Sequence, residues 1–352
     1  MNRLYRCVWT GLVITVASAA AVAGDKAVIF YEPKDYGSEA LFNPLSSFSS
    51  YTLDSLQVKR SFTTDNYADK LRMVRDNLRS PGNRIDEEGG TRRFINTEIF
   101  PVDPDNISDS GAMLPNYGLH LFGGGMIYRK NAEWFQAHDV PWPYVTSGVL
   151  SIVTEFLAEG FEKPATDSTD EIADFYLFRP LGIWLFSSDK RARWIKDNLD
   201  PVEWPHMTMY DVKENEVLNV GMSYVVRPRW LATEDRRMFL YMGITNLLGL
   251  SHTMDSGDAL SWGLGASTES INPDKFRASA GVFYDRNNSL LASLIVRGTE
   301  GLAVRANIYP GALFNETGKL PFPLGLFVGV TDDGDPALGI QFGLPIGLGA
   351  TF

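Results

Sequence analysis

Four side chains in the middle of this sequence have the chemistry of acid–base catalysis. They are His120, Glu155, Asp170 and Asp174. A histidine oriented by a carboxylate can act as a general base on a serine hydroxyl or on water, so these four are the candidate catalytic residues. Asp170 and Asp174 are four residues apart, which places both carboxylates on one face of a predicted helix.

The sequence identifies neither a nucleophile nor a cofactor for these residues. Ser147 and Ser151 precede Glu155 on the same predicted helix, but no G-x-S-x-G elbow occurs. One histidine and two carboxylates also suit a metal ion, yet the H-E-x-x-H spacing is missing, and the sequence predicts no metal and no cofactor. The favoured interpretation is a buried polar network, in which cationic partners come from the predicted strands: Arg227, Arg277 and Arg305.

Three predicted helices position the candidate residues. The first runs from Tyr144 to Glu159, after Pro143 and before Gly160, and is too interrupted to span a bilayer. Residues 168–174 begin with a capping-box spacing, which predicts the start of a second helix. Residues 189–199 form a third, amphipathic pattern. We therefore expect a helical domain over residues 111–201.

Three consecutive glycines, Gly123 to Gly125, follow His120 by a few residues. Glycine permits close approach of the backbone to another group, so this segment is expected to contact something closely. Its spacing fits neither the dinucleotide fingerprint nor the P-loop, which excludes both kinds of nucleotide site.

Several short motifs together resemble a family of bacterial cell-envelope proteins known as a domain of unknown function. They are the His120-x-x-Gly123-Gly124 motif, the helix that carries Glu155, the Asp170-Glu171-Ile172-Ala173-Asp174 motif and the Pro180-Leu181-Gly182 segment. The resemblance covers residues 110–200. It implies a Gram-negative envelope setting and nothing about a mechanism.

The N-terminus reads as a secretory signal. Arg3 and Arg6 precede an apolar run that ends on small residues, and cleavage is expected before Gly24, so residues 1–23 form the predicted signal peptide. The single cysteine, Cys7, leaves with this segment, which excludes disulfides, cysteine-bound zinc and thiol catalysis in the mature chain. The mature chain retains 30 basic against 43 acidic residues, a net charge of −13. Such acidity argues against nucleic acid as a partner.

The last 150 residues show a two-residue period that predicts β-strands. Apolar side chains alternate with glycine, serine, asparagine and arginine, which suits a membrane barrel with a crowded or watery lumen. The fold class expected is therefore mainly β with an α-helical insert: an antiparallel outer-membrane β-barrel of 8 to 12 strands, plugged or capped by the helical segment. A soluble periplasmic barrel is the alternative. The strand segments are expected near 218–226, 237–248, 258–267, 276–285, 289–297, 302–308, 323–331 and 338–352.

The chain ends on an aromatic residue, Phe352, with apolar residues at every second position before it. This ending resembles the signal that the outer-membrane assembly machinery recognises in the last strand of bacterial barrels. Ala350 departs from the pattern, because a larger residue is usual there. The expected partners are thus outer-membrane lipid and the assembly machinery, and the expected location is the outer membrane, with the periplasm as the alternative.

Residues 24–110 are less informative, and residues 53–62 and 92–100 are possible further strands, with a helix over 67–78 and a loop over 79–91. Together these patterns favour an outer-membrane barrel protein with a structural or binding role and no assignable reaction. An outer-membrane hydrolase that acts on lipid or peptidoglycan through the His/carboxylate residues is the alternative. A pore is disfavoured, because side chains fill a barrel of about eight strands.

Overall fold

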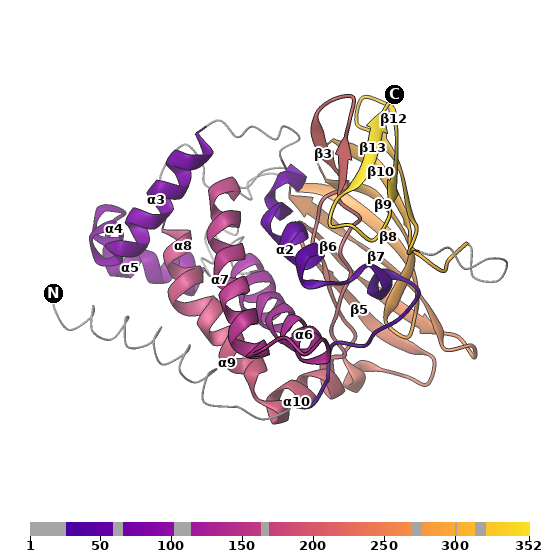
Figure 1. Cartoon of the computed structure of the whole chain (residues 1–352), viewed down its shortest axis with the longest axis horizontal. Helices are drawn as coiled ribbons and strands as arrows, with labels where there is room; N and C mark the ends of the chain where they lie inside the picture. The colour runs from indigo at the N-terminus through magenta and orange to yellow at the C-terminus, as the bar shows by residue number, and fades with distance from the viewer. Residues whose placement is uncertain are drawn as a thin grey trace. The chain divides into compact units, whose positions relative to one another are not determined.

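A computed structural model describes residues 26–58, 66–101, 114–162, 169–268, 276–299, 301–313 and 322–352. The chain divides into two compact units, which are described separately (Figure 1). The first is mainly helical and consists, among the described residues, of 26–31 and 66–194. The second is mainly β and consists of 32–58 and 195–352. The predicted signal peptide lies outside the described residues.

Among its described residues, the helical unit is built from α-helices and three π-helices; the label η marks π-helices and 3-10 helices alike. None of the described helices is both long enough and apolar enough to cross a membrane. The elements are α3 (Tyr67–Arg79), α4 (Pro81–Glu87), α5 (Gly90–Phe94), η3 (Ile95–Ile99), η5 (Leu114–Gly123), α6 (Gly124–Ala137), α7 (Pro143–Glu162), α8 (Asp170–Ala173), η6 (Asp174–Phe178), α9 (Arg179–Ser187) and the first part of α10 (Asp189–Leu199).

Helix α6 is the centre of this unit. Its residues Tyr128 and Ala132 form one apolar cluster with Tyr144 of α7 and Ile183 of α9. Its other buried face holds the start of the described chain, because Glu133 accepts backbone N–H bonds from both Phe30 (2.7 Å) and Tyr31 (2.8 Å). Contacts on two sides therefore hold α6 in place, and none of them involves a candidate site residue.

The predicted helices at 144–159 and 189–199 are confirmed as α7 and α10, and the helix expected over 67–78 is α3. The two possible N-terminal strands are wrong where the structure describes them. Residues 54–58 form a 3-10 helix, η2 (Asp54–Val58), while 59–62 lie outside the described residues; residues 92–99 lie in α5 and η3. The loop expected over 79–91 contains α4, which starts at a proline in its first turn. Over so few residues the spacing of apolar side chains does not distinguish strand from helix, and both errors lie in short segments.

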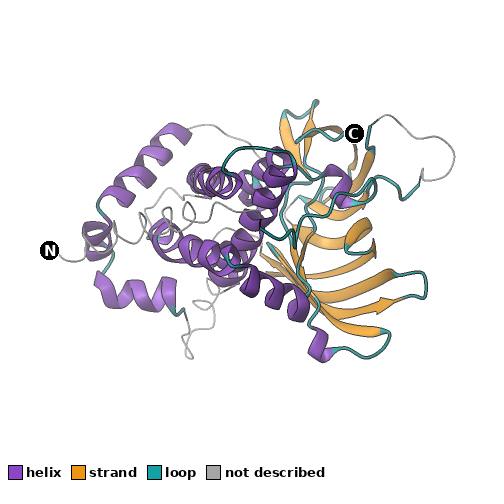
Figure 2. Cartoon of the chain, turned by 60° about the horizontal axis from the view of Figure 1, so that its bottom comes forward, coloured by secondary structure: helices purple, strands orange, loops and turns teal. Residues whose placement is uncertain are grey.

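The second unit contains a thirteen-stranded mixed sheet (Figure 2). It also contains η1 (Ser38–Leu41), α2 (Pro44–Thr52), η2 and the short 3-10 helix η7 (Arg229–Leu231). Asn43 caps α2 by accepting the N–H bonds of Leu45 and Ser46. The strands are β1 (Val202–Glu203), β2 (Met209–Asp211), β3 (Glu216–Leu218), β4 (Tyr224–Val226), β5 (Arg236–Met242), β6 (Thr245–Thr253), β7 (Asp258–Thr268), β8 (Phe276–Arg286), β9 (Ser289–Thr299), β10 (Leu302–Ile308), β11 (Gly325–Thr331), β12 (Pro336–Gln341) and β13 (Gly347–Thr351).

The strand order is β1-β4-β5-β6-β7-β8-β9-β10-β11-β12-β13-β2-β3. Neighbouring strands are antiparallel, except that β13 pairs with β2 in parallel, with Gly347 opposite Met209 and Gly349 opposite Asp211. The order ends at β1 and β3, so the paired strands do not form a closed ring. The expectation of a mainly β chain with helices is confirmed. The expectation of a purely antiparallel sheet is wrong, because β13 and β2 are parallel.

Three predicted strands are each divided. Residues 218–226 contain the end of β3 and all of β4, residues 237–248 lie in β5 and β6, and the long C-terminal pattern 338–352 contains β12 and β13. Between β12 and β13 the chain turns, and Gly343 adopts φ +75°, which favours glycine. The alternation continues through this turn without a change of parity, so the sequence period gives no sign of the interruption.

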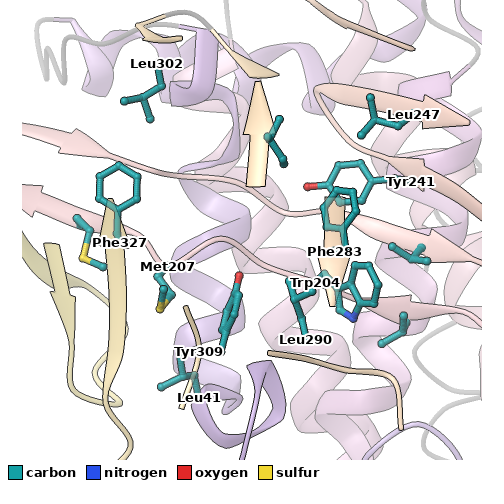
Figure 3. Close-up of a cluster of buried hydrophobic side chains, with 14 of the residues drawn as sticks. Leu41, Trp204, Met207, Tyr241, Leu247, Phe283, Leu290, Leu302, Tyr309 and Phe327 are labelled. Atoms are coloured by element: carbon teal, nitrogen blue, oxygen red, sulfur yellow. The ribbon is translucent and has the colours of Figure 1, made fainter. Parts of the chain in front are cut away.

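A cluster of buried apolar side chains fills the inner side of the sheet (Figure 3). Phe283 of β8 is at its centre, with ring centroids 5.6 Å from Trp204, 5.3 Å from Phe239 and 4.9 Å from Tyr241. Tyr309 joins this cluster and donates a hydrogen bond to the Pro205 carbonyl at 2.6 Å. The interior of the sheet is therefore packed with aromatic rings close to its polar side chains.

Candidate functional site

The structure brings His120 and Glu155 together inside the helical unit. His120 lies in η5 and Glu155 in α7, and both side chains are buried. The distance from His120 Nδ1 to Glu155 Oε1 is 2.8 Å. In the tautomer in which Nδ1–H donates to this carboxylate, Nε2 is the basic nitrogen; in the other tautomer Nδ1 carries a lone pair that can bind a metal ion. The first tautomer is the one that a histidine general base requires.

Asp174 is the third member of the cluster. It is the first residue of η6, its side chain is 0 % exposed, and its Oδ2 lies 3.8 Å from His120 Nδ1, too far for a hydrogen bond. Within the described part of the chain, neither of its oxygens has a hydrogen-bond partner. Burial raises the pKa of Asp174 well above its ordinary value, and the nearby charges of Asp170 and Glu159 raise it further.

Arg179 is a site residue that the sequence interpretation missed. It begins α9, and its guanidinium forms an ion pair with Glu155 Oε2 in the buried interior. The Arg179-Pro180 pair predicts only the limit of a helix, because Pro180 is found at first-turn positions. Nothing in the sequence marks this arginine as the partner of a glutamate 24 residues earlier.

The three glycines have a specific packing role. A Cβ on Gly124 would collide with the Arg179 guanidinium, with Cζ only 2.9 Å away. A Cβ on Gly125 would lie 2.7 Å from the Gly182 carbonyl oxygen and 2.6 Å from the Phe186 ring. Gly124 therefore makes room for the cation of the site, and Gly125 lets α6 approach α9. The close approach expected from the sequence is to α9.

Asp170 lies apart from this cluster. His120, Glu155 and Asp174 form the group whose ligand atoms lie within 4.8 Å of one another, and Asp170 is not in it. Asp170 also acts on Glu98 of η3. Burial, together with the Asp170 charge, raises the pKa of Glu98 to about 8. Asp170 thus belongs to a second acidic pair beside the site.

The candidate nucleophile Ser147 is occupied elsewhere. Its hydroxyl is buried and donates a hydrogen bond to the Tyr128 carbonyl at 2.6 Å. It also lies eight residues before Glu155 on α7, about 12 Å along the helix axis. The arrangement therefore does not support a catalytic pair of Ser147 and His120.

The three arginines expected as cationic partners have different surroundings. Arg227 forms a buried ion pair with Asp285 at 2.7 Å, and Arg277 pairs with Asp332 at 2.9 Å. Arg305 of β10 is 1 % exposed, and none of its three guanidinium nitrogens finds a hydrogen-bond partner in the parts of the chain that the structure describes.

The backbone around the site is unusual. His120 and Asp174 both lie in π-helical segments, and so does Glu98. π-Helical turns are rare and occur frequently at functional sites. The cluster has the components of a general base, a histidine beside a carboxylate, and also those of a small metal site.

Comparisons with known protein families, curated proteins and solved structures found no match to this chain.

Proposed function

We propose that the β-rich unit lies in a lipid bilayer as a closed barrel, and that the protein is a bacterial outer-membrane barrel protein with a structural or binding role. The observation that supports this most strongly is the distribution of side chains on the two faces of the sheet. Apolar side chains cover the exposed face, while the buried face holds polar side chains among its aromatic rings.

The exposed face consists of rows of apolar side chains that continue from strand to strand. One row follows the strand register across nine strands, and every member of it is apolar. It contains Met238, Leu250, Trp262, Val282, Leu294, Ala306, Val328, Leu338 and Ala350. In the adjacent row, Leu248 is 58 % exposed and Leu264 is 63 % exposed. A contiguous surface of this extent is rare on a protein surrounded by water.

The buried face carries a network of polar side chains beside its aromatic cluster. Ser261 donates to Ser251 at 2.9 Å, and Ser267 is hydrogen-bonded to both Thr245 (2.8 Å) and Ser279 (2.7 Å). A soluble antiparallel sheet places its apolar side chains inside and its polar ones in water. A continuous apolar face on the outside, with polar side chains among those inside, is a feature of transmembrane barrels.

The height of the apolar face fits a bilayer. On β8 the outward positions run from Phe276 to Tyr284. Eight steps of about 3.3 Å give about 26 Å along the strand, or about 20 Å across the bilayer at a tilt of about 40°. Membrane barrels have an apolar band about 25 Å tall.

The two ends of the strand order meet in one hairpin, which supports closure. β1 and β2 lie on one segment, 202–211, and β3 and β4 lie on the next, 216–226. Between the two short ladders, Trp204 N–H donates to the Ser223 carbonyl and His206 N–H to the Gly221 carbonyl, each at 2.8 Å. The two segments therefore pair along their length, while one also pairs with β13 and the other with β5.

A ring built this way contains eleven segments, the two of the hairpin and the nine strands β5–β13. In a ring of alternating directions an odd number requires one parallel pair, and the β13–β2 pair supplies it. Single-chain bacterial barrels usually have an even number of strands, so this protein departs from the common pattern.

The proposal is tested by placing a charge on the outward face. Leu264→Arg should lower the amount of membrane-assembled, heat-modifiable protein, because arginine at mid-bilayer costs about 2–4 kcal/mol. The matched control is Trp194→Arg, since Trp194 is 59 % exposed but belongs to the helical unit. It should leave assembly unchanged.

Fractionation of the mature chain completes the test, and the expected result is recovery in the outer membrane after carbonate extraction. A soluble periplasmic protein, with Leu264→Arg tolerated as well as Trp194→Arg, would refute the proposal.

A further inference from the structure

The three site residues of the helical unit have the geometry of metal ligands. His120 Nδ1, one Glu155 oxygen and one Asp174 oxygen all lie within 4.8 Å of one another, and all three side chains are buried. An ion bound tetrahedrally at about 2.1 Å from each donor separates its ligand atoms by about 3.4 Å. The observed separations from Nδ1, 2.8 Å to Glu155 and 3.8 Å to Asp174, lie on either side of this value.

Asp174 provides independent evidence for a ligand. It is fully buried, and both its oxygens lack a hydrogen-bond partner among the residues that the structure describes. Buried carboxylates are otherwise paired, hydrogen-bonded or coordinated to a metal. This side chain is directed at His120 and is not otherwise held, so a cation between the two would satisfy it.

The charges around Asp174 favour a cation. Its side chain is under the electrostatic influence of Asp170, Glu159, Glu162 and Glu98, all of which are acidic. Arg179 is a cation beside the cluster, and it contacts the second oxygen of Glu155. That contact leaves Glu155 Oε1 directed at His120 and fixes the orientation of the carboxylate, as outer partners of metal ligands do.

We propose that His120, Glu155 and Asp174 bind one divalent transition-metal ion, of the class of Zn²⁺ or Mn²⁺. One imidazole and two carboxylates are donors that these ions accept. Three protein ligands leave a coordination position open for water or a substrate. This site lies wholly within the helical unit and does not depend on where the protein is located.

The test is a metal titration of the purified full-length mature protein. After chelator treatment and dialysis, ZnCl₂ and MnCl₂ are added separately, and binding is followed by calorimetry and by metal analysis of the dialysed protein. We expect one equivalent of at least one of the two ions per chain. Bound metal should also raise the unfolding temperature of the helical signal at 222 nm, since a ligand that binds only the folded state stabilises it.

Two variants and one control make the titration specific. Asp174→Asn keeps the shape of the side chain and has no hydrogen bond to lose, so it is expected to fold, and His120→Gln removes the imidazole. Each substitution should weaken metal binding by about 100-fold or more, because loss of an outer partner alone costs about 10- to 100-fold. The control is His252→Gln, because His252 and Asp235 form an exposed histidine–carboxylate pair at 3.3 Å. It should bind metal like the wild type.

The results divide cleanly. Wild-type binding no tighter than that of Asp174→Asn overturns the proposal, and so does loss of the binding in His252→Gln. If His120→Gln fails to fold, Asp174→Asn and the wild-type shift in unfolding temperature still decide the question. Because the titration is the same for protein purified from membrane or from the soluble fraction, its failure is distinguishable from failure of the barrel proposal.

Discussion

Replacing Gly124 by alanine tests whether the glycine exists to accommodate Arg179. The added Cβ would collide with the guanidinium and lie 2.9 Å from its Cζ, so the guanidinium must move. Arg179 and Glu155 are both almost fully buried, which leaves the displaced cation little space. We therefore expect Gly124→Ala to separate the Arg179–Glu155 ion pair.

The magnitude follows from two opposing effects. Breaking a buried ion pair costs about 3–5 kcal/mol, because an uncompensated charge stays buried. Replacing glycine by alanine in a helix returns about 0.5–1 kcal/mol. The net expectation is a loss of about 2–4 kcal/mol, or roughly 5–15 °C in the unfolding temperature of a unit of this size.

The assay is thermal unfolding of the full-length, chelator-treated protein, followed by circular dichroism at 222 nm. The matched control is Gly148→Ala on α7, where an added Cβ meets only Tyr128 Cε2 at 3.8 Å. That control should gain about 0.5–1 kcal/mol. The two alanine variants are thus expected to shift stability in opposite directions.

A second background identifies the cause. In Glu155→Gln protein the buried carboxylate charge is already gone, so adding Gly124→Ala should cost far less than it does in the wild type. Equal costs in the two backgrounds would refute the reasoning, because they would show that the glycine acts through packing alone. A stabilising Gly124→Ala would refute it as well.

Three further predictions concern other residues. The pKa of Glu98 is raised to about 8, so the folded protein keeps a proton on Glu98 that the unfolded chain releases from about pH 4.5 upward. The stability that this proton contributes is therefore complete below pH 4.5 and is lost as pH rises through 8. After discounting for its partial exposure, we expect the helical unit to lose about 2 kcal/mol over this window, and Glu98→Gln should flatten the pH dependence of thermal unfolding; an unchanged slope contradicts this. Arg305→Met should raise the free energy of unfolding of the sheet by about 1–4 kcal/mol, which is measured as a higher unfolding temperature. A lower unfolding temperature would show that the guanidinium has a favourable partner. Deleting Phe352, whose side chain is 62 % exposed, should reduce heat-modifiable assembled protein although it removes little buried area, and unchanged assembly would exclude recognition through this residue.

The period of the sequence predicted the sheet better than it predicted the strand ends. Leu264 and Val282 face outward and Ser261 and Phe283 inward, as alternation requires. The turn at Gly343 was invisible, because the apolar residues on either side of it keep the same parity. The parallel pair between β13 and β2 was also not predictable, since no local pattern reports which distant strand becomes a neighbour.

The candidate site was only partly predictable, for a related reason. Glu155 stands out as a charge among apolar helix residues, and His120 beside three glycines is unusual, so both attract attention from sequence alone. Their 2.8 Å contact and the approach of Asp174 depend on how η5, α7 and η6 pack. Arg179 was missed because its partner is determined by the α6–α9 crossing at Gly125 and Gly182. Asp170 shares a motif with Asp174 but is directed at Glu98.

The parallel β13–β2 pair has a consequence for the order in which the protein is built. Asp211 and Thr351, which are joined there by a 2.7 Å hydrogen bond, are 140 residues apart in the chain. Every antiparallel neighbour from β4 to β13 can form progressively as the chain lengthens, but this contact must wait until the C-terminus has been synthesised. Until then, two sheet edges with unpaired backbone groups are exposed, and each is a template for pairing with a second chain. Slow formation of the β13–β2 pair should therefore lead to intermolecular sheet aggregates rather than to a partly formed sheet.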